Sequence, residues 1–372
     1  MTVYLDNAAT SWPKPPEVLR AAEAAITEPA GNPGRSAHEA ALEAAAAVFD
    51  AREELGALFG AAPQRVIFTH NATHALNLAI TGLAGHLKTK RTVLTDVWQH
   101  NSVLRPLFRL RDRGVVDLRF ADPDRVENAL DDSVGMGVFS AKSNVTGRMF
   151  DIKGISAALK SAGAYFVCDG SQAAGSETLN IGDLGITALC VPGHKGLMGL
   201  TGTGAMILSD SCPLFEPLLS GGTGNYSKSP LMPPEPPERY EAGTLNVVGI
   251  AALAQGVRFV SGVGVEAIGD RERSLGAYTA ELLRLVPGVT VYSAENGIVL
   301  LNKSGVPSGD LEAALARSGV CARSGFHCAP LAHDALHTGE HGALRLSFGW
   351  FNSHTDVHAA VQAVASARGF AI

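Results

Sequence analysis

The stretch Ile186-Thr-Ala-Leu-Cys-Val-Pro-Gly-His-Lys-Gly196 joins a short apolar run to a glycine-rich loop that carries a single lysine, Lys195. Further glycines follow at positions 199, 202 and 204, where the next apolar run begins. Because glycine has no side chain, such a loop lets the backbone approach a ligand closely. The stretch therefore predicts a buried strand that ends at a small-molecule site.

Similar apolar runs occur on both sides of this stretch, and helical patterns separate several of them. The runs cover residues 65–69, 91–95, 135–140, 164–168, 186–191 and 204–208. This alternation predicts an α/β domain with a mostly parallel sheet. Ligands of such sheets bind beyond the carboxyl ends of the strands, so the polar residues that follow the runs are the first candidates for a site.

Three further segments give local predictions. A capping box at Ser36-Ala-His-Glu39 predicts the start of a helix that ends at Gly60. A helical stretch at residues 247–260 is expected to lead out of the large domain. The proline-rich residues 229–238 predict a surface loop, or alternatively the lining of a site mouth.

Composition excludes several classes of protein. The 372 residues are 46% hydrophobic and 18% charged, with a net charge of −6 and no cluster of Lys and Arg, which argues against nucleic-acid binding. The first residues do not form a signal peptide and no apolar run is long enough to span a bilayer, so we expect a cytoplasmic protein without membrane contact. The five cysteines are an odd number in a long chain without a signal sequence, which argues against a disulfide framework. No two of them have C-x-x-C spacing, which argues against a structural zinc site.

Two polar segments that follow apolar runs suit a phosphorylated ring. The segment His70-Asn-Ala-Thr73 opens a helical stretch, whose free N–H groups favour a phosphate; an ordinary helix cap explains it better when it is taken alone. Asp169 ends another run, where a carboxylate needs a partner such as a protonated pyridine nitrogen. A helix cap at Asp169 is an equal alternative.

Lys195 is a candidate for covalent cofactor binding. A free lysine has a pKa of about 10.4 and must be activated by its surroundings, as happens when it forms a Schiff base with pyridoxal phosphate (PLP). The alternative is an exposed loop lysine. A nucleotide-binding loop is not supported, because the order G-x-x-x-x-G-K-[ST] is absent.

The segment Arg323-Ser-Gly-Phe-His-Cys-Ala-Pro330 places Cys328 beside His327, and both His327 and Arg323 could lower the pKa of its thiol. A buried structural cysteine is the alternative, which we accept for Cys168, Cys190, Cys212 and Cys321. Arg345 lies within an apolar strand pattern and predicts binding of a carboxylate, although a structural salt bridge is commoner.

The order of these segments resembles the class V aminotransferase family and, within it, the cysteine desulfurase/selenocysteine lyase group. The resemblance extends from Tyr4-Leu-Asp-Asn-Ala-Ala-Thr10 to Arg345-Leu-Ser-Phe-Gly-Trp-Phe-Asn352. It implies the PLP-dependent transferase fold of type I, with helices on both faces of the central sheet and a smaller α+β C-terminal domain. Residues 1–15 are then expected to line the active site, residues 16–250 to form the large PLP-binding domain, and residues 251–372 to form the small domain with Cys328 and Arg345.

The resemblance also implies cofactor-binding roles. Lys195 would hold PLP as a Schiff base, Asp169 would pair with the pyridine nitrogen, and Gln172 with the ring hydroxyl. His100 would stack on the ring, and Thr244 would reach the phosphate bound by the neighbouring subunit of a homodimer. The implied cofactor-binding residues together are Ala72, Thr73, His100, Asn144, Asp169, Gln172, His194, Lys195 and Thr244.

Arg345 and Asn144 would bind the substrate, and the catalytic residues would be Lys195, His100 and the nucleophile Cys328. The implied reaction moves sulfur from L-cysteine to Cys328 as a persulfide and releases alanine, with a sulfur-acceptor protein as partner. Alternatives on the same fold are a selenocysteine lyase acting on L-selenocysteine, a β-lyase, an epimerase or an aminotransferase. An alternative of another class is a non-catalytic scaffold that keeps the PLP fold.

Two positions depart from the family pattern. Pro192 stands where the family usually has a Ser or Thr that binds phosphate, and proline has neither a hydroxyl nor an N–H. Gln99 precedes the stacking His100 where an acidic residue is frequent. Phosphate binding is therefore expected to depend more on His194, Thr73 and the backbone.

Overall fold

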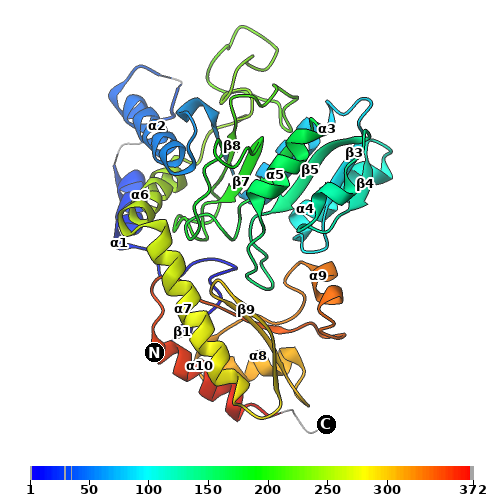
Figure 1. The fold of residues 1–372 in the computed structure, drawn as a ribbon. Coiled ribbons are helices and arrows are strands. Elements are labelled where there is room, and N and C mark those ends of the chain that lie inside the picture. Colours follow the sequence, from blue (N-terminus) through cyan, green and yellow to red (C-terminus); the bar gives the residue numbers. More distant parts are fainter. Residues whose placement is uncertain (1, 29–30, 35, 369–372) are drawn as a thin grey trace.

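The apolar runs form a seven-stranded sheet at the centre of the larger part of the molecule (Figure 1). The structure is a computed structural model that describes residues 2–28, 31–34 and 36–368. The strand order is β2-β8-β7-β6-β5-β3-β4, and only β8 runs antiparallel to its neighbours, which confirms the mostly parallel sheet. The strands are β2 (Val66–Thr69), β3 (Thr92–Thr95), β4 (Asp117–Phe120), β5 (Val134–Ser140), β6 (Tyr165–Asp169), β7 (Ala188–Pro192) and β8 (Gly204–Leu208).

Helices cover both faces of this sheet, as expected. The helices α3 (Ala72–Ala84) and α4 (Asn101–Asp112) share one apolar cluster with the strands. The helices α2 (Glu39–Phe59), α5 (Ile152–Ser161) and α6 (Val247–Val263) share the cluster on the opposite face. Every residue of β5 is buried, because a parallel strand covered on both faces has no solvent side.

The start of α2 differs from the prediction. His38, and not Ser36, caps the helix, because its extended backbone lets Nδ1 accept the Ala41 N–H at 3.2 Å. The predicted end is confirmed: Gly60 adopts the left-handed conformation, with φ of 71°, that closes many helices. The proline-rich residues 229–238 form no helix or strand and are largely at the surface.

A sharp bend at Gly264 joins α6 to α7 (Val265–Arg284). The two helices meet at 79°, and Gly264 has a φ of 95°, which side chains rarely permit. Among the described helices, none by itself is long and apolar enough to cross a membrane, and α6 and α7 meet that criterion only as this bent pair. Because α6 packs against α1 (Pro16–Thr27) and α2, we propose that the boundary between the parts lies nearer Gly264 than residue 250.

The smaller part contains a three-stranded antiparallel sheet of order β12-β10-β9 and a parallel pair, β1 with β11. A separate apolar cluster packs these strands against α7, α8 and α10. The remaining elements are β1 (Val3–Tyr4), η1 (Pro63–Arg65), η2 (Val126–Ala129), β9 (Val289–Glu295), β10 (Ile298–Lys303), α8 (Ser308–Arg317), β11 (Val320–Cys321), α9 (Pro330–Ala335), β12 (Leu344–Ser347) and α10 (His354–Ser366).

The N-terminal segment connects the two parts. Leu5 is fully buried in the core of the smaller part, and Asp6 forms a bridge with Ser347. A few residues later, the Ser11 N–H donates to the His194 carbonyl at 3.1 Å in the larger part.

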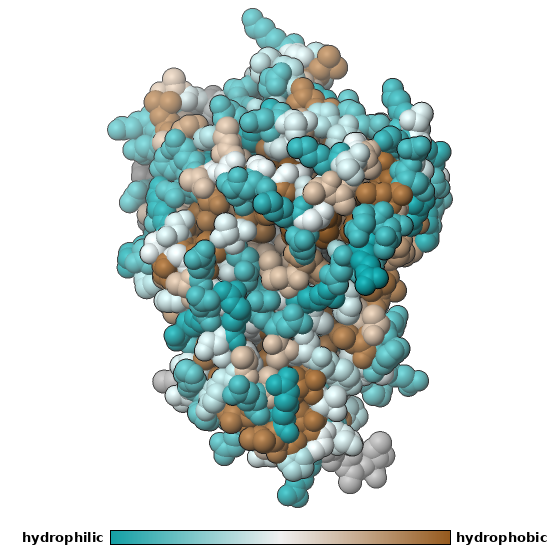
Figure 2. Space-filling model, in the orientation of Figure 1, coloured by the Kyte–Doolittle hydropathy of each residue, from teal (hydrophilic) through white to brown (hydrophobic). Residues whose placement is uncertain are grey.

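Hydrophilic side chains cover much of the face shown in Figure 2, and apolar groups gather in a patch on the smaller part.

Candidate active site

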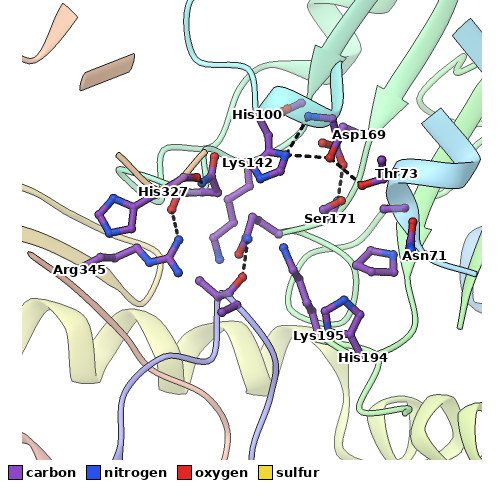
Figure 3. Close-up of a pocket in the computed structure, with 18 of the residues that line it drawn as sticks. Asn71, Thr73, His100, Lys142, Asp169, Ser171, His194, Lys195, His327 and Arg345 are labelled. Carbon is purple, nitrogen blue, oxygen red and sulfur yellow. Dashed lines mark hydrogen bonds between the residues drawn. The ribbon is translucent and has the colours of Figure 1, made fainter. Parts of the chain in front are cut away.

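A cavity of about 220 Å³ lies at the carboxyl ends of the parallel strands, where the two parts of the molecule meet. Ser140, Asp169 and Pro192 end three neighbouring strands and all line it. This position agrees with the rule for ligands of open α/β sheets. Most of the predicted site residues line the cavity: Ala72, Thr73, His100, Asn144, Asp169, Gln172, His194, Lys195 and Arg345. Figure 3 labels six of them, namely Thr73, His100, Asp169, His194, Lys195 and Arg345.

Lys195 reaches the cavity from the glycine-rich loop after β7. Its backbone carbonyl accepts the Ser11 hydroxyl at 2.7 Å, which fixes the loop to the N-terminal segment. Burial lowers the pKa of Lys195 to about 8; nearby Asp169 opposes this shift, and Arg345 adds to it. An appreciable fraction of the amine is therefore neutral, and nucleophilic, near neutral pH.

Asp169 ends β6 with only 4% of its surface exposed. One carboxylate oxygen, Oδ1, accepts the Ser171 N–H at 2.9 Å, as in the cap that the sequence offered as an alternative. Within the described part of the chain, the other oxygen, Oδ2, has no hydrogen-bond partner. The cap thus leaves one oxygen for a donor in the cavity. Gln172 lies beside it, and its side-chain amide donates to the Ala8 carbonyl at 2.9 Å.

A chain of polar groups connects α3 and α4 at the cavity (Figure 3). The hydroxyls of Thr73 and Ser102 are 2.7 Å apart, and Ser102 Oγ lies 2.9 Å from His100 Nδ1. The Ser102 N–H also donates to Nδ1, so the ring proton of neutral His100 is on Nε2. Burial lowers the pKa of His100 to about 4, which leaves a neutral ring suited to stacking. Ser102 was not predicted, although it lies only two residues after His100.

His194 offers an unsatisfied donor or acceptor. Its Nδ1 is buried and has no hydrogen-bond partner in the part of the chain that the structure describes, and burial lowers the pKa of the ring to about 4. Its carbonyl is held by side chains of the N-terminal segment, at 3.0 Å from Thr10 Oγ1 and 2.8 Å from Lys14 Nζ. Pro192 lines the cavity beside it without a hydroxyl.

Arg345 projects from β12 with 2% of its surface exposed. Its Nη2 pairs with Asp6 at 3.0 Å and its Nη1 donates to the Asn144 carbonyl at 2.8 Å. The structural salt bridge offered as an alternative is therefore present. Among the described residues, however, the buried Nε has no hydrogen-bond partner, so the guanidinium keeps one N–H for a further acceptor such as an anion.

Lys142 is a cavity-lining residue that the sequence analysis missed. It is 4% exposed, and its Nζ lies 3.9 Å from Glu272 Oε2. Burial lowers the pKa of Lys142 and raises that of Glu272 to about 7. Lys142 follows β5 by two residues, so the strand-end rule that selected Asp169 would also have selected Lys142.

Cys328 and Thr244 do not line the cavity. Cys328 is exposed on the loop after β11, and its carbonyl accepts the Asn101 N–H at 2.7 Å, which places it next to the start of α4. Both ring nitrogens of His327 lie within hydrogen-bond distance of other groups, the His333 ring and the Arg323 carbonyl, so the expected activation of Cys328 by this ring stays a prediction. Thr244 is exposed and accepts a hydrogen bond from Asn32 at 3.4 Å; its expected role toward a neighbouring subunit stays a prediction.

These groups fit PLP. Lys195 provides an amine of lowered pKa, Asp169 a free carboxylate oxygen, and the start of α3 its unpaired N–H groups. His194 Nδ1 and Arg345 Nε are buried atoms without hydrogen-bond partners among the residues of ranges 2–28, 31–34 and 36–368, and an anionic ligand would supply such partners. Among the described residues, no group of three His, Cys, Asp or Glu side chains could hold a metal ion.

Comparison with known protein families identifies the family of this chain. The family described as Aminotransferase class-V matches residues 3–360. The chain belongs to this family. Membership in the class V aminotransferases implies PLP as the cofactor, which agrees with the donors and acceptors in the cavity.

The sequence similarity between this class V aminotransferase and its relatives covers nearly the whole chain. A probable cysteine desulfurase of Methanothermobacter thermautotrophicus is 30% identical over 95% of this chain and 92% of its own. Probable cysteine desulfurase 2 of Mycobacterium leprae is 30% identical over 99% of this chain and 92% of its own.

Solved structures give the same family. The apo cysteine desulfurase of Thermococcus onnurineus NA1 has 28% identity and a TM-score of 0.90 over 98% of this chain and 94% of that chain. The cysteine desulfurase CsdA of Escherichia coli, in an S-sulfonic acid form, has 25% identity and a TM-score of 0.89 over 98% of this chain and 94% of that chain. These neighbours confirm the expected type I fold.

Proposed function

We propose that this class V aminotransferase is a PLP-dependent cysteine desulfurase. The observation that carries the proposal is the position of an exposed thiol next to the cavity of Lys195 and Arg345. Cys328 is bonded through its carbonyl to Asn101, the residue after His100, and its neighbour His327 lines the cavity. Buried cysteines elsewhere in the chain lack this access: burial raises the pKa of the Cys212 thiol to about 12, whereas Cys328 is exposed.

Each cavity residue then has a role toward an amino-acid substrate. Lys195 Nζ would hold the cofactor, Asp169 Oδ2 would bond its ring nitrogen, and Thr73, His194 and the start of α3 would bind its phosphate. The unpaired Nε–H of Arg345 would bind the substrate carboxylate. When bound, PLP withdraws the electron pair that remains after loss of the Cα proton. The amine of Lys195, with a pKa of about 8, would remove that proton and later return it.

The sulfur step balances without an external oxidant. The Cys328 thiolate attacks the sulfur of the substrate, an S–S bond forms, and the C–S bond breaks with its electron pair left on the substrate carbon. That carbon takes up a proton, so L-cysteine and one thiol give L-alanine and one persulfide. A second thiol, from a small reductant or an acceptor protein, must then take the sulfur from Cys328.

The proposal extends to a homodimer and to the choice between sulfur and selenium. Thr244 is exposed and outside the cavity, as a residue that serves a neighbouring subunit would be. L-selenocysteine is the alternative substrate, and selenium leaves carbon more readily than sulfur. Loss of selenocysteine turnover together with cysteine turnover on removing Cys328 would favour a desulfurase over a lyase.

The test compares Cys328→Ser with Cys321→Ser, a control cysteine that is half-buried and does not line the cavity. Both proteins should bind PLP with the yellow colour of the parent protein. Alanine and sulfide from L-cysteine, measured with a thiol reductant, should fall below detection in Cys328→Ser and persist in Cys321→Ser. Normal alanine formation by Cys328→Ser would reject the proposal.

A further inference from the structure

A buried chain of hydrogen bonds leads away from the cavity behind Cys328. His327 Nε2 lies 3.1 Å from the Arg323 carbonyl, and His327 Nδ1 lies 3.0 Å from His333 Nε2 on α9. On the far side, His333 Nδ1 lies 2.8 Å from Thr338 Oγ1. All three side chains are at least nine-tenths buried, with exposures of 4% for His327, 2% for His333 and 5% for Thr338.

The direction of every hydrogen bond in this chain is fixed. A carbonyl can only accept, so Nε2 of His327 carries a proton. In the neutral ring Nδ1 is then an acceptor, and His333 must donate to it from Nε2. His333 Nδ1 is left as an acceptor, so the Thr338 hydroxyl gives its proton to this nitrogen at 2.8 Å in preference to the His333 carbonyl, which lies 3.5 Å from Oγ1. The Arg323 carbonyl thereby sets the tautomers of both rings, Thr338 stabilises that of His333, and the His333 N–H in turn fixes the orientation of His327.

Burial, together with nearby charged groups, keeps the rings of His327 and His333 neutral. Burial lowers the pKa of His327 to about 2, and Arg345 and Arg323 add to the effect. Burial lowers the pKa of His333 to about 4, with Arg345 acting in the same direction and Asp334 opposing it. His327 is therefore not a proton carrier for the neighbouring thiol at neutral pH.

The chain of hydrogen bonds ends at residues 327 and 328, where the backbone is strained. His327 and Cys328 have positive φ angles of 50° and 57°, a region that costs side-chain-bearing residues energy. Two backbone contacts help to hold them there: Asn144 donates to the His327 carbonyl at 2.8 Å, and the Asn101 N–H donates to the Cys328 carbonyl at 2.7 Å. The ring of His327 is the third attachment, and it depends on His333.

We propose that His333 and Thr338 are positioning residues that act through His327 to hold Cys328 in the conformation needed for sulfur transfer. Neither residue touches substrate or cofactor, since neither lines the cavity. The inference deepens the proposed desulfurase function and rests on it. It assigns His327, the residue before the nucleophile, the role of holding the loop in place. The side chains that orient His327 are then those of His333 and Thr338, six and eleven residues further along the sequence.

The test uses two pairs of variants on the PLP-loaded enzyme. Thr338→Val removes the hydroxyl at nearly constant shape, and Thr338→Ser retains it. His333→Ala removes the N–H donor to His327, and His333→Gln retains one. Loss of one buried hydrogen bond should lower kcat for alanine formation from L-cysteine about tenfold in Thr338→Val and His333→Ala. Thr338→Ser and His333→Gln should restore most of it, with KM unchanged throughout.

Two further measurements separate positioning from general damage. Exchange of the Cα proton of L-alanine in D2O needs Lys195 but no thiol, so it should be unchanged in all four variants. Hydrogen–deuterium exchange at the Asn101 amide, which bonds the Cys328 carbonyl, should be about tenfold faster in Thr338→Val and His333→Ala.

Unchanged kcat and unchanged Asn101 exchange in Thr338→Val would overturn the inference. A loss of Cα exchange as large as the loss of kcat would also overturn it, because such a loss would indicate general damage to the site. The amide measurement does not depend on sulfur chemistry. If Cys328→Ser turned over cysteine normally, the proposed function would fail, while Asn101 exchange would still report whether His333 and Thr338 hold the loop.

Discussion

Replacement of Arg345 by lysine isolates the recognition of the substrate carboxylate. Arg345 uses Nη2 for Asp6 and Nη1 for the Asn144 carbonyl, and within the described structure its buried Nε has no hydrogen-bond partner. A lysine at this position keeps the charge but has a single ammonium group, which cannot satisfy Asp6, Asn144 and a substrate at the same time. The variant should fold with its charge balance intact and lose the planar fork.

The size of the effect follows from the bonds that the fork would make. A hydrogen bond to a charged group contributes about 1.5–3 kcal/mol, and the Nε–H of Arg345 would supply one such bond to the carboxylate. Lysine has no N–H at this position, so we expect a net loss of about 2 kcal/mol. That loss corresponds to a decrease in kcat/KM for L-cysteine of about 30-fold. Most of it should appear in KM, because the carboxylate is remote from the bonds that change.

The assay measures alanine-equivalent turnover by Arg345→Lys with two substrates, L-cysteine and cysteamine, which lacks the carboxylate. Cysteamine should be a poor substrate of the parent protein, and Arg345→Lys should be no poorer with it. Arg284→Lys, an exposed position in the last turn of α7, is the matched control. Equal losses with both substrates, or an unchanged kcat/KM for L-cysteine, would refute carboxylate binding by Arg345.

Three other variants test neighbouring features. Asp96 is fully buried and burial raises its pKa to about 7, so the native protein loses stability as pH rises from about 4 through 7. Asp96→Asn cannot ionise, so its melting temperature should change less between pH 5 and pH 8 than that of the parent protein. Pro192→Thr adds a hydroxyl at the cavity wall and should slow PLP loss on dialysis about fivefold, measured by absorbance. Lys142→Met removes the charge 3.9 Å from Glu272, whose pKa is raised to about 7, so the melting temperature should fall increasingly above pH 7 and recover in the double variant with Glu272→Gln.

The central sheet was predictable because its strands are buried on both faces. Each of the apolar runs identified in the sequence became a strand within about two residues of its predicted bounds. The edge strand β4 (Asp117–Phe120) was missed, because its alternation is short and its end residues are exposed. The cap of α2 was missed because histidine is not among the preferred N-cap residues, although its Nδ1 can accept the same hydrogen bond.

The site was predictable where a residue type and a strand end coincide, as for Asp169 and Lys195. The sequence could not give the partners of each group, since these come from segments far apart in the chain. Asp6 pairs with Arg345 across 339 positions, and the Ser11 hydroxyl reaches the Lys195 carbonyl across 184. Sequence adjacency also suggested that His327 activates Cys328, whereas the ring is committed to His333 on α9.

Substrate recognition and thiol placement are joined by one set of contacts that alternates between the two parts of the molecule. Arg345 on β12 donates to the Asn144 carbonyl at 2.8 Å, and the Asn144 amide donates to the His327 carbonyl at 2.8 Å. The next residue, Cys328, accepts the Asn101 N–H at the start of α4. Because Asn144 and Asn101 belong to the larger part while Arg345 and Cys328 belong to the smaller part, any separation of the two parts breaks these contacts together. A substrate carboxylate bound to Arg345 would add a hydrogen bond at the centre of this set, so it would stabilise the same arrangement that holds the thiol beside the cavity.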